Sequence, residues 1–215
     1  MKRILIFMLL IFLVGCPQPP QQYKTIALYG DSHRIGFSQE LRRITSGQME
    51  IWDTGVINNG DSHLVLDTIQ KYSGPPTLSA GAYDAIYIET GTWNCLAYYG
   101  HVPDTPSQYE ASIRKIIAAT RVLNPTAPII FATTMPTLMC LLGAPEEYNA
   151  VLFALAAEHP NVYIDDLYGY VLAQGLERID GVHYSMADYA LIARHVNETI
   201  QGLLYPGDPD WKPGH

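Results

Sequence analysis

Ser32 stands where the chain can support nucleophilic chemistry. It lies in Tyr29-Gly30-Asp31-Ser32-His33, after the apolar run 25–28 and before a segment with helical spacing. A strand that breaks at a glycine and turns into a helix leaves the serine at the helix N-terminus, where unpaired N–H groups and the helix dipole favour negative charge. Acyl transfer through a serine needs that environment. Gly-Asp-Ser is also ordinary turn chemistry, with Asp or Ser capping the next helix.

A base for such a serine is present near the other end of the chain. Asp180-Gly181-Val182-His183 precedes the final helical segment. An aspartate three residues before a histidine can accept a hydrogen bond from Nδ1, which leaves Nε2 to take the serine proton. The alternative is a surface loop in which Asp180 and His183 have no joint role.

Two further segments offer hydrogen-bond donors for an oxyanion. Glu89-Thr90-Gly91-Thr92-Trp93-Asn94 follows an apolar run, and its Asn94 can supply an amide N–H. Asn58-Asn59-Gly60 follows another apolar run, and Gly60 can bring a bare backbone N–H close to a substrate. Both segments are also compatible with simple turns, and Gly55 is an alternative to Gly60.

The elements that must position these residues alternate along the chain. Short β-branched-rich runs, typical of buried strands, occupy residues 25–29, 49–53, 85–90, 128–134 and 162–166. Segments with helical spacing occupy residues 37–45, 62–72, 107–123, 145–159 and 186–204. Alternating strands and helices predict an α/β fold, a parallel sheet covered by helices on both sides. Ligands bind such sheets at the carboxyl ends of the strands, where all the candidate residues lie.

Two of these helices have marked starts. Ser107 is followed three residues later by Glu110, and Ser185 by Asp188, which predicts reciprocal capping at both positions.

The order of these motifs resembles the four signature blocks of the SGNH (GDSL) hydrolases over nearly all of the domain. The blocks are Gly30-Asp31-Ser32, then Gly60, then Gly91-Thr92-Trp93-Asn94, then Asp180-Gly181-Val182-His183. The resemblance implies a flavodoxin-like three-layer α/β/α sandwich with a five-stranded parallel sheet. It makes Ser32 the nucleophile and a backbone oxyanion donor, Gly60 a second backbone donor, Asn94 a side-chain donor, His183 the general base and Asp180 the residue that orients it.

The chain departs from the family pattern at two places. Cys95 stands after Asn94, where the family usually has an aspartate. Gly-Asp-Ser-His occurs a second time, at residues 60–63. No apolar strand immediately precedes Ser62, so we expect Ser62 to cap a helix or to lie on the rim of the site.

The N-terminus has the features of an export signal. Residues 1–15 contain Lys2 and Arg3 followed by an apolar run, as in a lipoprotein signal peptide. Leu13-Val14-Gly15-Cys16 resembles a bacterial lipobox, which implies cleavage before Cys16 and its lipidation; an uncleaved anchor is the alternative. Residues 16–22 are rich in proline and glutamine and predict an extended tether. Residues 23–205 then form the hydrolase domain, and residues 206–215 a tail.

The net charge and the cysteine count restrict the classes of partner and cofactor that the sequence predicts. The formal net charge is −8, which argues against nucleic acid. With Cys16 lipidated, Cys95 and Cys140 are an even pair that can form a disulfide outside the cytoplasm or remain as buried thiols. The spacing of Asp61, His63 and His101 requires no metal, and no phosphate-binding glycine loop is present, so neither metal nor organic cofactor is expected.

The sequence thus predicts an extracytoplasmic, lipid-anchored serine esterase of the bacterial cell envelope. No long apolar lid segment stands near the motifs, which favours a small acyl ester, above all acetyl, with an acetylated glycan as the substrate we expect. Tyrosines at 98, 99, 168 and 170 are candidates for the cleft rim. A lysophospholipase or thioesterase, and a non-catalytic glycan-binding surface lipoprotein, are the alternatives.

Overall fold

A parallel β-sheet forms the centre of the molecule in the computed structural model, which describes residues 23–53, 60–71, 83–96, 102–140 and 145–207. The strands are β1 (Lys24–Tyr29), β2 (Met49–Asp53), β3 (Ala85–Glu89), β4 (Ile129–Ala132) and β5 (Val162–Asp165), in the order β2-β1-β3-β4-β5. Every neighbouring pair is parallel. This is the flavodoxin-like order, and it confirms the predicted fold class.

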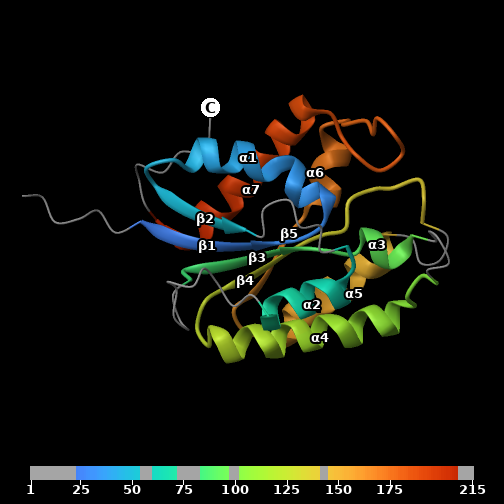
Figure 1. The fold of residues 1–215 in the computed structure, drawn as a ribbon, viewed down its shortest axis with the longest axis horizontal. Helices are drawn as coiled ribbons and strands as arrows, with labels where there is room; N and C mark the ends of the chain where they lie inside the picture. The colour runs from blue at the N-terminus through green and yellow to red at the C-terminus, as the bar shows by residue number, and fades with distance from the viewer. Residues whose placement is uncertain (1–22, 54–59, 72–82, 97–101, 141–144, 208–215) are drawn as a thin grey trace, which may run out of the picture.

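Helices cover both faces of the sheet (Figure 1). On one side lie α1 (Ser32–Thr45), α6 (Leu167–Ala173) and α7 (Met186–Leu204), and on the other α2 (Ser62–Lys71), α4 (Pro106–Leu123) and α5 (Pro145–Glu158). The short helix α3 (Thr92–Cys95) follows β3 directly. The result is a three-layer α/β/α sandwich.

An apolar core lies between the sheet and the helices on each of its two faces. On one face, Phe37 and Leu41 of α1 pack with Ile192 and Val196 of α7 against strand residues that include Ile26. On the other face, residues of α2, α4 and α5 pack against the alternate strand side chains. In the inner strands β1, β3 and β4 the side chains are buried on both faces, as expected for a parallel sheet. This burial fixes where each strand ends and therefore where the loops of the carboxyl edge begin.

Two helix starts differ from the prediction. Helix α1 begins at Ser32 and not at Phe37, because Asp31 caps it and accepts a hydrogen bond from the backbone N–H of His33. The apolar spacing did not reveal this first turn, since it buries the polar residues His33 and Arg34. Helix α4 is capped by Thr105 with Gln108 as a capping box, and not by Ser107 with Glu110.

Helices α3 and α6 were not predicted at all, because four and seven residues are too few for a helical period to show. The predicted start of α7 is confirmed, since Ser185 accepts a hydrogen bond from the Asp188 N–H.

The predicted signal peptide, residues 1–15, and tether, residues 16–22, lie outside the described residues, as do Cys16 and most of the tail. Among the helices that the structure does describe, none combines the length and the apolarity that crossing a membrane requires.

Candidate active site

The carboxyl edge of the sheet brings Ser32 and His183 together. Ser32 opens α1 just after β1, and His183 lies in the loop before α7. His183 Nε2 lies 2.8 Å from Ser32 Oγ, and His183 Nδ1 lies 2.7 Å from Asp180 Oδ2. An imidazole that donates Nδ1–H to a carboxylate presents Nε2 as an acceptor for the hydroxyl. The three residues thus form one hydrogen-bonded line that can activate a serine.

Asp180 is held by its own loop. Besides the His183 ring, its Oδ1 accepts the backbone N–H groups of Val182, at 2.9 Å, and His183, at 2.7 Å. The hydrogen bond from the His183 ring, with these two backbone bonds, holds the pKa of Asp180 well below its usual range. Asp180 therefore stays ionised and keeps the imidazole in one orientation. The side chains of Asp180 and His183 are 53% and 38% exposed, so a substrate can reach them.

The turn before Ser32 is tightly packed. Gly30 has φ +156°, and a Cβ there would lie 2.7 Å from the carbonyl oxygen of Glu89. Only glycine fits at this point, because the backbone of β3 passes so close. The turn therefore rests directly on Glu89, which is fully buried.

His33, next to the serine, is not part of the hydrogen-bonded line. It is buried, its Nδ1 lies 3.1 Å from the Tyr189 hydroxyl oxygen, and its ring centroid lies 5.7 Å from that of His183. Burial lowers the pKa of His33, so it is a neutral side chain that packs behind the base.

Asn94 and Gly60 both lie at the same edge of the sheet as Ser32. Gly60 is buried with φ +58° just before α2, and Asn94 is buried in α3. The Asn94 side chain is fully engaged: Oδ1 accepts the Ser62 N–H at 3.0 Å, and Nδ2 donates to Ser62 Oγ at 2.8 Å and to Asp104 Oδ2 at 2.7 Å. In this conformation both Nδ2 hydrogens have protein partners.

We expected from the sequence that Ser62 would cap a helix or lie on the rim of the site. The structure shows that it does neither. Asp61 is the cap, since its Oδ1 accepts the N–H groups of His63 and Leu64. Ser62 is fully buried and bonds the Asn94 amide through both its backbone N–H and its hydroxyl. The second Gly-Asp-Ser-His therefore joins the second block to the third and presents no second nucleophile to solvent.

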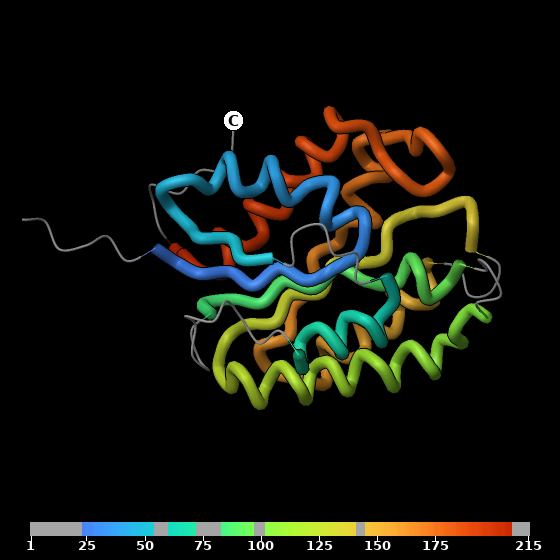
Figure 2. Tube along the Cα trace, viewed as in Figure 1, coloured from blue at the N-terminus to red at the C-terminus, as the bar shows by residue number. Residues whose placement is uncertain are grey.

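Residues 133–140, here called the strap, connect the two halves of the site. Cys140 is joined by a disulfide to Cys95, the residue after Asn94. Leu138 N–H donates to the carbonyl oxygen of Gly181, in the loop of the base, at 3.0 Å. In Figure 2 the strap is yellow and runs between the green α3 and the orange loop that precedes α7. Through this disulfide and the Leu138 hydrogen bond, the strap ties Cys95 and the neighbouring Asn94 to the loop of the base.

The remaining candidates lie elsewhere. Tyr170 stacks on His195 of α7, with ring centroids 4.1 Å apart, and so is turned toward that helix. The Tyr168 hydroxyl bonds Glu146 of α5. Gly55, Tyr98, Tyr99 and His101 lie outside the described residues. No group of metal-ligating side chains is found among the residues that the structure describes.

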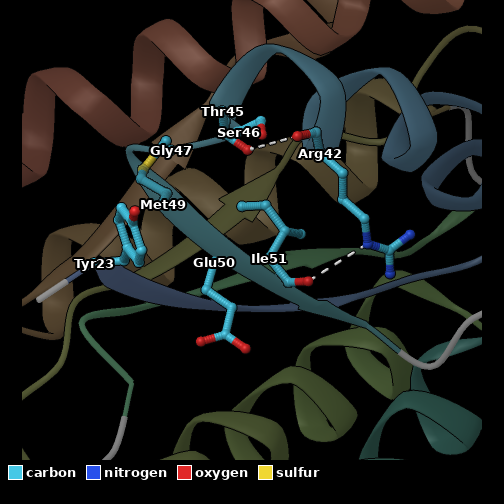
Figure 3. Close-up of a pocket in the computed structure, with 8 residues that line it drawn as sticks. All are labelled: Tyr23, Arg42, Thr45, Ser46, Gly47, Met49, Glu50 and Ile51. Atoms are coloured by element: carbon cyan, nitrogen blue, oxygen red, sulfur yellow. Dashed lines mark hydrogen bonds between the residues drawn. The ribbon is translucent and has the colours of Figure 1, made fainter. Parts of the chain in front are cut away.

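A cavity of about 510 Å³ lies at the opposite, amino edge of the sheet. Figure 3 shows its lining, which runs from Tyr23 and the end of α1 to the start of β2 and contains Tyr23, Arg42, Thr45, Ser46, Gly47, Met49, Glu50 and Ile51. Arg42 pairs with buried Asp53 and donates to the Ile51 carbonyl oxygen. These lining residues include no histidine and no cysteine, and none of them belongs to the line of Asp180, His183 and Ser32.

Solved structures of low sequence identity share this architecture. A G-D-S-L family lipolytic protein from Veillonella parvula has a TM-score of 0.65 at 17% identity, covering 83% of this chain and 98% of that one. A carbohydrate esterase family 3 protein from Talaromyces cellulolyticus has a TM-score of 0.61 at 15% identity, covering 84% and 98%. An acetyl esterase variant with an acetate ion has a TM-score of 0.60 at 16% identity, covering 84% and 98%. The chain has the SGNH/GDSL hydrolase fold. No family model and no curated protein matches its sequence.

Within this SGNH/GDSL fold, sequence reasoning missed one residue that contacts the site. Asp104 bonds the Asn94 amide, and its own backbone N–H donates to the Asn94 carbonyl oxygen at 2.8 Å. Asp104 stands before α4 and outside every motif, so no sequence signal marked it. Tyr148 of α5 fixes both residues, because its hydroxyl lies 3.0 Å from the Asn94 carbonyl oxygen and also donates to that of Asp104.

Proposed function

We propose that this protein is a serine ester hydrolase in which Ser32 is the nucleophile, His183 the general base and Asp180 the residue that orients it. One observation carries the proposal, the continuous line from Asp180 Oδ2 through the His183 ring to Ser32 Oγ, with steps of 2.7 and 2.8 Å. A binding protein has no need of a carboxylate, an imidazole and a hydroxyl in this order. The fold, shared with esterases and lipases, supports the same assignment.

The first half of the reaction acylates the serine. Ser32 Oγ attacks the carbonyl carbon of the ester while His183 Nε2 takes the hydroxyl proton, and a tetrahedral intermediate with a negative oxygen forms. The imidazolium is stabilised by ionised Asp180. When the intermediate collapses, the bond to the alcohol oxygen breaks and His183 returns the proton to that oxygen, which leaves the acyl group on Ser32.

The second half repeats these steps with water. His183 takes a proton from a water molecule, the resulting hydroxide attacks the acyl carbon, and a second tetrahedral intermediate forms. Its collapse returns the proton to Ser32 Oγ and releases the carboxylic acid. The proton travels between Ser32 and the water through one imidazole nitrogen, and no redox step is involved.

The proposed oxyanion donors are the N–H groups of Ser32 and Gly60 and the Asn94 amide. The Ser32 N–H is in the first turn of α1, where amides have no intrahelical partner and the dipole favours an anion. The Asn94 amide requires one exchange: an Nδ2 hydrogen must leave Ser62 or Asp104 to reach the oxyanion. An oxyanion that develops full charge is a stronger acceptor than the Ser62 hydroxyl.

Small acyl esters, with acetyl first, are the substrates we propose, and an acetylated glycan is the proposed alcohol part. The similar structures of a carbohydrate esterase and of an acetyl esterase support this choice. The open position of His183 and Asp180 suits a bulky alcohol, because a glycan can approach an exposed site without entering a deep pocket.

A lysophospholipase or thioesterase is the second candidate, and one observation favours it. Leu138 and Ile179 are 74% and 70% exposed, and their backbones bond the loop of the base at Gly181 and His183. Apolar side chains in this position can cover a longer acyl chain. Hydrolysis rates for p-nitrophenyl esters from acetate to decanoate distinguish the two candidates, and a loss of the long-chain rates alone in Leu138→Ser would support the second.

We also propose that the protein is anchored in the bacterial cell envelope through lipidated Cys16. The lipobox-like sequence supports this, and the domain is connected to Cys16 by residues 16–22. Cys16→Ser should release the protein from the membrane fraction. Retention of the Cys16→Ser variant in that fraction would favour an uncleaved anchor.

The direct test of the proposed activity is release of p-nitrophenol from the acetate ester. Ser32→Ala should abolish it, whereas Ser46→Ala, an exposed serine at the far edge of the sheet, should leave the rate unchanged. Activity that survives in the Ser32 variant would overturn the assignment. A wild-type protein without esterase activity that still binds glycans would favour the non-catalytic alternative.

A further inference from the structure

Two buried carboxyl groups lie at the turn that carries Ser32. One belongs to Asp31 in the turn itself, and the other to Glu89 at the end of β3. Asp31 and Glu89 are each 0% exposed. The Asp31 N–H donates to Glu89 Oε2 at 3.2 Å, so the two residues are in direct contact. Oδ2 of Asp31 and Oε1 of Glu89 have no hydrogen-bond partner among the described residues. The two carboxyl groups also contact each other, and two negative charges in contact without water would repel each other strongly.

The nearby cations, buried Arg34 and partly exposed Arg42, offset this pair only in part. Arg34 is fully buried and lies 3.5 Å from Asp53 Oδ2, and Arg42 pairs with the other oxygen of Asp53. The carboxyls of Asp31, Glu89 and Asp53 thus face two guanidinium groups, and Asp53 is in contact with both of them. One negative charge is in excess unless one of the three carboxyls is protonated.

The hydrogen bonds indicate which carboxyl is neutral. Asp31 caps α1, where its Oδ1 accepts the His33 N–H at 2.8 Å and the helix dipole favours an anion. Among the described residues, the Glu89 carboxyl accepts a backbone N–H only from Asp31, and it caps no helix. Burial, followed by the charge of Asp31, raises the pKa of Glu89 well above its usual range.

We propose that Asp31 and Glu89 share one proton, carried by Glu89, and that this proton positions the turn that presents Ser32. A neutral Glu89 can donate a hydrogen bond to the Asp31 carboxylate while it accepts one from the Asp31 N–H. The two hydrogen bonds together hold the turn against β3. Glu89 is a positioning residue, since it touches Asp31 and not the reacting atoms. The catalytic part of this inference rests on the proposed function; the shared proton itself does not.

Loss of the proton would place a second negative charge beneath the nucleophile. The titratable groups that face Glu89 are Asp31 and Arg34 of the first turn of α1, Tyr109 of α4, Tyr189 of α7 and Tyr87 of β3. Burial raises the pKa of each of these tyrosines, so they remain neutral and do not offset the change. Because native Glu89 holds its proton to a higher pH than unfolded Glu89, it makes the fold less stable as the pH rises above about 4.

The test compares wild type with Glu89→Gln, which keeps the shape and is neutral at every pH. We expect the ratio of the wild-type unfolding constant to that of the variant to rise with pH, by up to about tenfold per pH unit, from about pH 5 upward until Glu89 ionises in the folded protein. A wild-type infrared band of a protonated carboxyl should be absent from the variant. A flat or falling ratio, or an unchanged band, would overturn the shared proton.

Matched variants separate positioning from simple folding. Asn149→Ala removes a buried amide that accepts the Thr134 N–H and donates to the Thr134 carbonyl oxygen, with no charge involved, so it should lower stability without the pH-dependent gain. For activity, Glu89→Gln should keep most of kcat and hold it at alkaline pH where wild type loses it, whereas Glu89→Leu should lower kcat with KM unchanged. Equal losses in the Gln and Leu variants would contradict positioning. If no variant or wild type hydrolyses esters, the proposed function fails, and the unfolding ratio and infrared band still decide the shared proton.

Discussion

His183 Nε2 lies 2.8 Å from Ser32 Oγ, although 151 residues separate the two in the chain. The contact depends on the packing of α7 against α1, because the loop of the base leads directly into α7. Tyr189 of α7 helps to fix this packing through its hydroxyl, which lies 3.1 Å from His33 Nδ1. The proposed chemistry therefore depends on an interhelical interface as well as on the three side chains.

Asp180→Asn should lower kcat by about 10²–10⁴, because an asparagine at this position does not select the productive tautomer of His183. A measurable residual rate should remain, since Ser32, His183 and the oxyanion donors are unchanged. Steady-state kinetics with p-nitrophenyl acetate measures this change. Glu177→Gln, an exposed carboxyl change in the same segment, is the control and should have no effect. An Asp180 variant with wild-type kcat would remove Asp180 from the proposed mechanism.

The stability contributed by Asp180 should depend on pH in one direction. Its folded pKa is held below the unfolded value, chiefly by the His183 ring, so the stabilisation is present above about pH 4 and is lost as the pH falls through the folded pKa. Urea unfolding of wild type and Asp180→Asn should therefore differ more at pH 7 than at pH 3. A larger difference at pH 3 would show that the hydrogen bonds do not favour the ionised form.

Asn94→Ala should lower kcat by about 10²–10³ with little change in KM, the loss expected for one oxyanion donor. Ser62→Ala should have a smaller effect, because Ser62 acts by holding the Asn94 amide at Oδ1 and Nδ2. The double variant should then be no worse than Asn94→Ala alone. If Ser62→Ala were as inactive as Ser32→Ala, the second Gly-Asp-Ser-His would have to take part in the chemistry itself.

Replacing Cys95 and Cys140 by serine together should lower the free energy of unfolding by about 2–4 kcal/mol, the usual contribution of a disulfide. Guanidinium unfolding with and without reductant measures the change. Reductant should destabilise the wild type and leave the double variant unaffected. If wild type unfolded identically in both conditions, the bond would be absent from the protein in solution.

The sequence predicted the sheet well because each strand is an apolar run bounded by turn residues, and a buried parallel strand has that pattern by necessity. Met49–Asp53 was predicted to the residue, and the other strands to within one or two at each end. The start of α1 was missed for a physical reason. Its first turn buries His33 and Arg34, which contact Tyr189 and Asp53, and no local pattern encodes these tertiary contacts.

The functional site likewise has a part that the sequence predicted and a part that it did not. Ser32, Asp180 and His183 could be named from their motifs, because their roles depend on residue type and on short spacings. The partners of the Asn94 amide could not, since Ser62 and Asp104 reach it only after α2 and α4 have packed on the sheet. The contact of Asp31 with Glu89 likewise depends on the pairing of β1 with β3.

The order of the functional residues along the chain also has a consequence for biosynthesis. Ser32 is among the first residues of the domain to be synthesised, and His183 is among the last, just ahead of α7. A nascent or truncated chain that ends before α7 contains the nucleophile, its donors and His183, but it lacks the helix whose packing on α1 brings His183 to Ser32, so we expect it to be inert toward esters. Hydrolytic capacity would thus be acquired in the final stage of folding, when the last helix packs against the first.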